Sequence, residues 1–244
     1  MSRGGPEIAM VAELVPAGRG AAARPAFEPG DGVPLGRAAR AGADVGDLVT
    51  VSLRGRGARV VAVHGPARSP RAALRALIAH EGLDRPFPRA ALEEAEAQSE
   101  GDWLADPGRR DARDRRVITI DPEGAKDHDD AIGVAPEGAD ATRLWVHIAD
   151  VSRFVAPGGP LDREAARRGC SVYVPGSVVP MLPPRLSADL CSLRPGVDRA
   201  AVTAELVMGP AGEVGAARFG RSLIRAERRL TYPEVDALLE GQTL

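Results

Sequence analysis

The strongest constraint on the fold of this chain is a crowd of carboxylates between two apolar runs. Four aspartates lie within ten residues of the stretch ITIDPEGAKDHDDAIGV, residues 118–134: Asp121, Asp127, Asp129 and Asp130. Like charges a few ångströms apart repel by about 4 kcal/mol at an effective dielectric near 20. A hard divalent cation removes that repulsion, and carboxylate oxygens are the ligands that such ions prefer. The stretch therefore predicts a Mg²⁺ site, with Mn²⁺ as the alternative ion.

The residues on either side predict that the aspartates occupy a loop held by two strands. An apolar run at 117–120 ends at Asp121, and apolar character resumes at 131–134. Pro122 and Gly124 supply a turn between the two runs. Carboxylates on a short loop between strands would form a rigid platform for metal chemistry.

Three other interpretations of the aspartates are weaker. An EF-hand calcium loop does not fit, because its sixth position would be Lys126 or Ile132 and its twelfth Ile132 or Gly138. A phosphatase of the haloacid-dehalogenase type needs an apolar strand running directly into Asp-x-Asp, whereas Lys126 precedes Asp127. A solvated acidic loop without a metal is disfavoured by the apolar runs on both sides.

Composition sets the broad class of the protein. The chain has 244 residues, 44% of them hydrophobic, and a net charge of −2. These values predict a globular chain of one or two domains without overall basicity. Two cysteines argue against a disulfide framework or a zinc site, and Cys191, in an apolar stretch, is predicted to lie in the core. No apolar run is long enough to span a membrane and no signal core begins the chain, so a cytoplasmic location is predicted.

Local charge is more informative than net charge. Five arginines crowd ahead of the aspartates: Arg109, Arg110, Arg113, Arg115 and Arg116. Arginine suits bidentate contacts with phosphate, which indicates contact with RNA. The run also contains Asp111 and Asp114, which is typical of a solvated linker. Both interpretations remain open at this point.

The chain divides into three predicted parts. Residues 1–66 alternate short apolar runs with Gly and Pro turns, the pattern of a small β-barrel, with strands expected at 8–15, 21–27, 47–53 and 59–64. Basic residues outnumber acids there and Phe27 is the only aromatic, so contacts with phosphate are expected more than base stacking. A packing module without RNA contact is the alternative.

Residues 67–116 predict a helical connector. Ser69 is placed to cap a helix that begins at Pro70 and ends before Gly82. Leu74, Leu77 and Ile78 form its apolar stripe. A second helix is expected at 89–98.

The region from 117 onward predicts mixed strands and helices. A strand at 143–151 has its apolar positions at Leu144, Val146 and Ile148. A helix is expected at 160–168, ended by Gly169, and a short strand at 171–174. A hairpin is expected to turn at 210–212. Thr231-Tyr-Pro-Glu234 reads as a capping box that opens a final helix.

The same aspartate spacing resembles the signature of the ribonuclease II and ribonuclease R family, which includes the exosome's hydrolytic exonuclease. That signature is a strand, Asp, five residues, Asp, one residue and Asp-Asp, met here by the four aspartates. The similarity continues through residues 145–169, 171–193 and 222–235. His128 departs from the apolar residue usual between the second and third aspartates, and its role stays open.

This resemblance implies a fold and a set of roles. The fold would be α+β: an OB or cold-shock-like barrel at 1–66, a helical linker at 67–116, and an incomplete N-terminal part of the RNB catalytic domain at 117–244. Asp121, Asp127 and Asp130 would hold two Mg²⁺ ions that activate water and stabilise the leaving oxygen. Asp129 would be the most directly catalytic of the four. Tyr173 would stack on a terminal base, the alternative being a half-buried strand residue. His147 and Asp150 are expected to make only local contacts.

The implied function is processive 3′→5′ hydrolysis of single-stranded RNA to nucleoside 5′-monophosphates by a truncated enzyme. Neither DNA, a membrane nor an obligate protein partner is expected. The first alternative is a non-catalytic RNA-binding remnant of such an enzyme. A metal-dependent phosphatase or other hydrolase built on the aspartates is the second.

Overall fold

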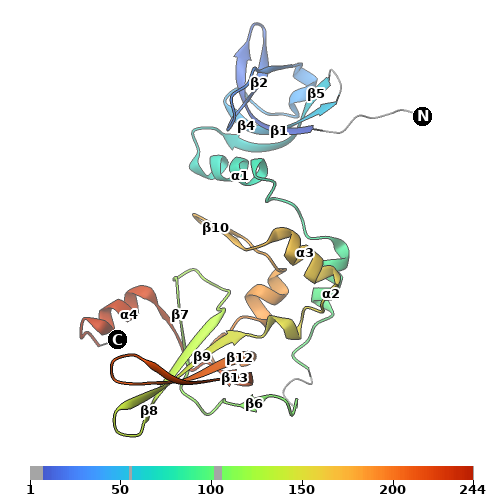
Figure 1. The fold of residues 1–244 in the computed structure, drawn as a ribbon. Helices are drawn as coiled ribbons and strands as arrows, with labels where there is room; N and C mark the ends of the chain where they lie inside the picture. The colour runs from blue at the N-terminus through green and yellow to red at the C-terminus, as the bar shows by residue number, and fades with distance from the viewer. Residues whose placement is uncertain (1–7, 55–56, 102–105, 244) are drawn as a thin grey trace. The chain divides into compact units, whose positions relative to one another are not determined.

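The computed structural model describes residues 8–54, 57–101 and 106–243. The chain folds into two compact units (Figure 1). Unit 1 comprises Met1–Pro86 with Val174–Val179, and unit 2 comprises Phe87–Tyr173 with Pro180–Leu244. None of the helices in the described ranges has the length and apolar character needed to cross a membrane.

Unit 1 is built on a five-stranded antiparallel sheet. Its strands are β1 (Ile8–Ala17), β2 (Gly20–Pro25), β3 (Val33–Leu35), β4 (Asp47–Arg54) and β5 (Gly57–Pro66), in the order β3-β2-β1-β4-β5. The four predicted strands are confirmed within a few residues. The sequence did not reveal β3, because three residues around a proline carry no alternation. Within the described residues no pairing of β3 with β5 closes the sheet, so the small β-barrel that the sequence predicted is not found as a closed barrel.

Helix α1 (Pro70–His80) lies across one end of the curled sheet of unit 1 (Figure 1). The backbone N–H of Ala72 donates to Ser69 Oγ at 3.4 Å, which confirms the predicted cap. The predicted leucine stripe is wrong, however. Ala72 and Ala76 are the buried residues of α1, and Leu77 is exposed. Small side chains let the helix backbone approach Val11 and Leu48 of the sheet closely, which leucines would prevent.

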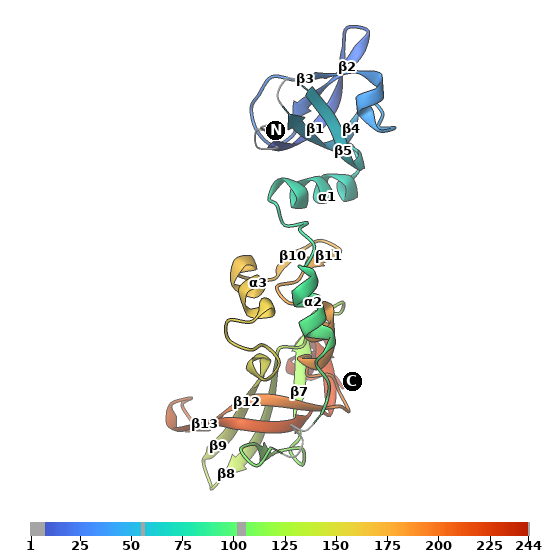
Figure 2. The same cartoon turned by 90° about the vertical axis from the view of Figure 1, so that its right-hand side faces the viewer.

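Unit 2 contains a seven-stranded mixed sheet. Its order is β14-β7-β8-β9-β12-β13-β6, with the β14–β7 and β13–β6 pairs parallel and the others antiparallel. The strands are β6 (Arg110–Asp111), β7 (Ile118–Asp121), β8 (Asp130–Glu137), β9 (Ala141–Ala149), β12 (Asp198–Met208), β13 (Val214–Arg225) and β14 (Arg228–Thr231). The predicted hairpin is β12–β13, whose long strands run side by side in Figure 2.

The remaining elements follow their local signals. Helices α2 (Arg89–Glu96) and α3 (Pro160–Arg168) lie near the predicted ranges, and Gly169 ends α3 with φ 79°. Helix α4 (Tyr232–Leu239) begins at the predicted capping box, with both of its hydrogen bonds present. The short elements are η1 (Arg37–Arg40), η3 (Val151–Arg153), the π-helical turn η4 (Leu186–Leu190), and the paired strands β10 (Val172–Val174) and β11 (Ser177–Val179).

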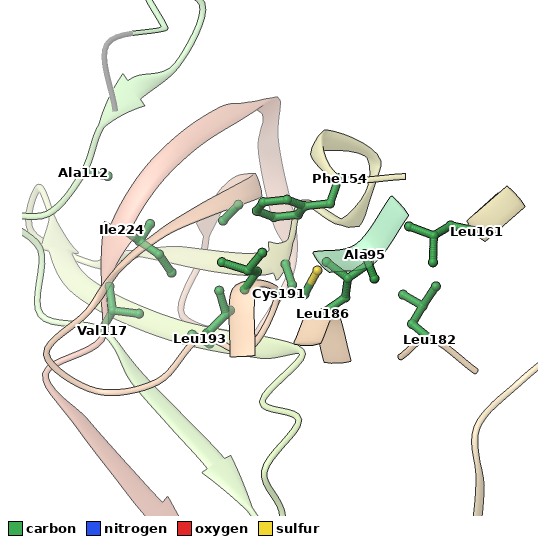
Figure 3. Close-up of a cluster of buried hydrophobic side chains, with 14 of the residues drawn as sticks. Ala95, Ala112, Val117, Phe154, Leu161, Leu182, Leu186, Cys191, Leu193 and Ile224 are labelled. Atoms are coloured by element: carbon green, nitrogen blue, oxygen red, sulfur yellow. The ribbon is translucent and has the colours of Figure 1, made fainter. Parts of the chain in front are cut away.

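The core of unit 2 lies between one face of the sheet and α2, α3 and η4 (Figure 3). The sheet contributes Ala149, Ala201 and Ile224, and the helical side contributes Ala95, Leu161 and Leu186. Cys191 is 3% exposed among them, as predicted.

The predicted strand is confirmed as β9, but its alternating apolar positions do not form its buried face. His147 and Ala149 face the protein interior, whereas Ile148, which shares a face with Leu144 and Val146, is 47% exposed. Hydrophobicity alone does not identify the buried face of this strand. The polar His147 can be buried because its Nδ1 has a hydrogen-bond partner in the interior.

Candidate functional site

The four aspartates gather at one end of neighbouring strands. Asp121 is the last residue of β7 and Asp130 the first of β8. The segment 122–129 between them, called here the aspartate loop, carries Asp127 and Asp129. The site thus lies where two strands leave the sheet, as the sequence predicted.

Contacts from distant segments fix the aspartate loop. Ser192 Oγ accepts the backbone N–H of His128 at 3.1 Å and donates to the carbonyl of Lys126 at 2.8 Å. The N–H of Leu193 donates to the carbonyl of His128 at 2.9 Å. The Arg229 guanidinium donates to the carbonyls of Pro122 and Glu123 at 2.7 and 2.5 Å. These bonds hold both halves of the loop in place.

His128 faces Asp121. Its Nδ1 lies 2.8 Å from Asp121 Oδ2, and the two residues are 5% and 8% exposed. The two atoms are close, but they do not meet with hydrogen-bond geometry, and neither has another hydrogen-bond partner. The first aspartate is therefore a buried carboxylate beside an imidazole, with one oxygen not satisfied by a hydrogen bond.

Tyr173 contacts the second aspartate. Its hydroxyl donates to Asp127 Oδ2 at 2.5 Å, and this hydrogen bond is the main reason that the pKa of Tyr173 is raised to about 12. The side chain is 61% exposed, so it is not the half-buried strand residue of the alternative interpretation. Base stacking by Tyr173 stays a prediction.

Asp129 is partly desolvated and lies near the other three carboxylates. Desolvation by the surrounding protein raises its pKa, and the charges of Asp127, Asp130 and Asp121 raise it further. His128 acts in the opposite direction to a smaller extent. The four carboxylates are thus close enough to repel one another, which is the condition under which a cation binds favourably.

The aspartates suit a divalent cation in donor type and charge but do not converge as ligands. Within the described ranges no group of three or more His, Cys, Asp or Glu side chains is placed to hold a metal ion. Asp121 lies instead against His128, and Asp127 is bonded to Tyr173. The unsatisfied Oδ2 of Asp121 and the raised pKa of Asp129 are the two features that fit a cation at this site.

A cavity of about 250 Å³ adjoins Asp127 and Asp129. Its walls are largely apolar and include Ile148, Met181 and Leu182. Cys191 also lines it, and burial raises the pKa of that thiol to about 12, so it is not a thiolate nucleophile at neutral pH. The cavity offers an apolar wall on one side and carboxylates on the other.

The neighbouring polar residues are structural, as expected for His147 and Asp150. His147 Nδ1 lies 2.7 Å from Thr203 Oγ1, inside the sheet. Asp150 accepts hydrogen bonds from Ser152 and from Arg109, whose side chain is as buried as its own. Arg109 therefore anchors the arginine run within the fold and is not available to RNA.

Sequence reasoning missed Ser192 and Arg229. Each acts through backbone carbonyls or amides of a loop more than 60 residues away. No local sequence pattern indicates such a contact, because only the tertiary fold brings these residues to the loop.

Comparisons with known proteins come from both sequence and fold. The RNB domain profile matches residues 109–244. Ribonuclease R of Vibrio parahaemolyticus is 38% identical over 212 residues, covering 83% of this chain and 25% of that protein. Ribonuclease R of Acidithiobacillus ferrooxidans is 43% identical over 183 residues, covering 75% of this chain and 42% of that protein. The chain thus spans less than half the length of these relatives.

Solved structures share the fold at lower identity. Mycoplasma genitalium RNase R in complex with double-stranded RNA aligns with a TM-score of 0.83 at 24% identity, over 97% of this chain and 43% of that one. Yeast Ssd1, described as a pseudonuclease, aligns with a TM-score of 0.71 at 17% identity, over 100% of this chain and 32% of that one. The same fold thus occurs in a ribonuclease and in a protein described as a pseudonuclease.

Proposed function

The chain belongs to the RNB-domain family, which includes ribonuclease R, and from this membership we propose that it is the front part of a 3′→5′ exoribonuclease. Single-stranded RNA would enter with its 3′ end at the aspartates and be hydrolysed processively to nucleoside 5′-monophosphates. One observation carries this proposal: four carboxylates in the family's spacing lie on and at the two ends of a loop that Ser192 and Arg229 fix.

Asp121, Asp127 and Asp130 would hold Mg²⁺, with Mn²⁺ as the alternative. When bound, the metal supplies an activated water and charge stabilisation for the leaving oxygen. Asp127 Oδ2 accepts a hydrogen bond from Tyr173, so Tyr173 would orient this carboxylate toward the ion. Desolvation and then the charges of the neighbouring aspartates raise the pKa of Asp129, and a cation would relieve the repulsion among these carboxylates.

Asp129 would orient the terminal ribose or the attacking water. Its pKa is raised and so lies closer to neutral pH than that of an ordinary carboxyl group. A carboxyl group with a raised pKa is suited to accept or hold a proton. The cavity beside it would receive the terminal nucleotide, with Ile148 and Met181 against the apolar parts. The exposed ring of Tyr173 would stack on a base, an interaction of about 1–3 kcal/mol.

Unit 1 would guide RNA through contacts with phosphate. The strand order β3-β2-β1-β4-β5 is compatible with a partly open oligonucleotide-binding barrel. Arg19, Arg37 and Arg40 line one cavity of this unit, with a single carboxylate, Asp44. The proposed division of the chain remains a barrel at 1–66, a connector at 67–116 and a catalytic part from 117.

The proposed function is tested by replacing the carboxylate of Asp129 with an amide of the same shape. Asp129→Asn is expected to abolish Mg²⁺-dependent shortening of a 5′-labelled single-stranded RNA while leaving binding of that RNA intact. The matched control is Asp140→Asn, an exposed aspartate in the β8–β9 turn. A time course with Mg²⁺ and with EDTA measures cleavage. Cleavage retained by Asp129→Asn would contradict the proposed mechanism.

A non-catalytic RNA-binding protein is the second candidate. The aspartate side chains do not converge on a metal position in the described structure, and a solved pseudonuclease has the same fold. The same time course separates the two candidates. Salt-dependent RNA binding by the wild-type chain, with no shortening of the RNA in Mg²⁺ or Mn²⁺, would favour this candidate.

A further inference from the structure

Unit 2 has a second cavity, away from the aspartates, at the β12–β13–β6 edge of the sheet. It has a volume of about 190 Å³. Its lining residues are Arg110, Arg115, Thr203, Glu205, Arg218, Phe219, Gly220, Arg221 and Ser222. At about 30 Å³ per water molecule, this space takes a phosphate group with part of its hydration shell. The residues of this lining are called the arginine cavity below.

Positive charge dominates the arginine cavity, because four arginines and a single carboxylate line it. Arg110 donates to Glu205 Oε2 at 2.7 Å, and Arg115 approaches the same oxygen at 3.9 Å. Arg221 lies 3.6 Å from Asp106, which is outside the lining. No ion pair found among the described residues includes Arg218. Arg110 and Arg115 thus share the negative charge of Glu205, and the cavity has a net positive charge.

Burial also leaves the positive charge of Arg115 only partly compensated by nearby carboxylates. Desolvation lowers the pKa of its guanidinium from the ordinary value, and Glu205 offsets this only in part. Its guanidinium carbon lies 4.3 Å from the centroid of the Trp145 ring, which holds the group in place. An anion in the cavity would supply the charge that the protein does not.

Hydroxyl groups form the inner wall. Thr203 Oγ1 lies 2.7 Å from His147 Nδ1 and 2.5 Å from Ser222 Oγ. His147 Nε2 is buried without a partner, and an unsatisfied lone pair is tolerated better than an unsatisfied N–H. We therefore assign the ring proton to Nδ1. Thr203 then accepts from His147 and donates to Ser222, which leaves the Ser222 proton free to point toward the cavity.

A glycine makes the space. Gly220 on β13 pairs with Thr203 on β12, so a side chain at 220 would point to the same face as Thr203. A Cβ built there meets no atom within 4 Å. A glycine in the interior of a strand weakens the strand, and it often marks a site where a ligand or another backbone segment approaches closely. The open position and the arginines around it together describe a site shaped for an anion.

From these observations we propose that the arginine cavity binds a backbone phosphate of RNA, as a contact site separate from the aspartates. Guanidinium and hydroxyl donors around a small space match a tetrahedral oxyanion. The choice of RNA as the source of the phosphate rests on the proposed function. The cavity also assigns a role to Arg110 and Arg115 of the arginine run, which sequence alone left open between linker and RNA contact.

Two variants test the site in different ways. Gly220→Leu fills the cavity without removing a charge, and its control, Ala217→Leu, adds the same side chain to the opposite face of β13. Arg218→Ala removes a charge, and its control, Arg89→Ala, removes an arginine that is 91% exposed on α2 and is paired only with Glu93 in the described residues. All four are made in the Asp129→Asn chain, so that the RNA stays intact.

Fluorescence anisotropy with a labelled single-stranded RNA measures the dissociation constant at several salt concentrations. Gly220→Leu and Arg218→Ala are expected to weaken binding by roughly three- to tenfold, and Arg218→Ala to reduce the salt slope by about 1, while the controls match the parent chain. Circular dichroism verifies that each variant is folded.

The outcomes separate this site from the proposed function. Unchanged affinity in both variants overturns the RNA site, even if the wild-type chain cleaves RNA. Weakened affinity in both, with no cleavage by the wild-type chain, supports the site and contradicts the proposed hydrolysis. Binding of an acidic peptide that is lost in Gly220→Leu, with no RNA binding, overturns the RNA site in favour of a protein interface.

Discussion

At the scale of single residues, buried polar groups decide how this protein responds to pH. His147 is fully buried, and burial, followed by the charge of Arg115, lowers its pKa from 6.5 to about 4. The unfolded chain therefore binds the imidazole proton more readily than the folded chain. The stability that His147 contributes is complete above pH 6.5 and is lost as the pH falls toward 4.

We expect this loss to reach about 3 kcal/mol of unfolding free energy near pH 4. Urea unfolding of the wild type and of His147→Gln at pH 7 and pH 4.5 measures it, and the quantity compared is the change with pH in each protein. His147→Gln should lose less stability than the wild type, because its side chain does not titrate. Equal losses in the two proteins would show that His147 is not the group responsible.

At the scale of elements, short signals in the chain determine where helices begin and end. Thr231 caps α4: its hydroxyl accepts the N–H of Glu234, and the Glu234 side chain accepts the N–H of Thr231. No residue of α4 is buried, so this cap is a main source of its order.

Thr231→Ala is therefore expected to destabilise α4 by about 1 kcal/mol, whereas Thr231→Ser keeps the hydroxyl and should match the wild type. Hydrogen exchange of the α4 amides measures the effect locally. Protection that is equal in Thr231→Ala and Thr231→Ser would mean that contacts other than the cap hold the helix.

At the scale of the whole molecule, a bound cation should stabilise the fold by mass action. A ligand at 100 times its dissociation constant adds about 2.7 kcal/mol when it binds only the folded state. Mg²⁺ relieves the repulsion around Asp129, so we expect the melting temperature of the wild type to rise with Mg²⁺ concentration.

The rise should be largely lost in Asp127→Asn and retained in Asp140→Asn. Differential scanning fluorimetry with Mg²⁺, and with matched ionic strength from NaCl, measures it without reference to activity. A rise of equal size in Asp127→Asn would place the ion away from the aspartate loop.

The sequence by itself determined the features that a short stretch of backbone controls. The cap at Ser69, the end of α3 at Gly169, the hairpin turn at 210–212 and the capping box at Thr231 were all predictable, because each depends on residues within four positions. The spacing of the aspartates also placed the site between two strands and led to the family. Local hydrogen bonding and backbone sterics are sufficient causes for these features.

Only the tertiary structure decided which faces are buried and what surrounds the site. Leucine was expected to pack in α1, but alanine does, because the distance between helix and sheet sets the side-chain size. The buried face of β9 contains His147, whose Nδ1 finds a hydrogen-bond partner in Thr203 on another strand. Ser192 and Arg229 fix the aspartate loop through contacts with residues distant in the chain. Gly220 leaves the arginine cavity open, because a Cβ at that position would meet no atom within 4 Å. Burial and hydrogen bonding between distant segments have no signature in a local pattern, so folding alone establishes them.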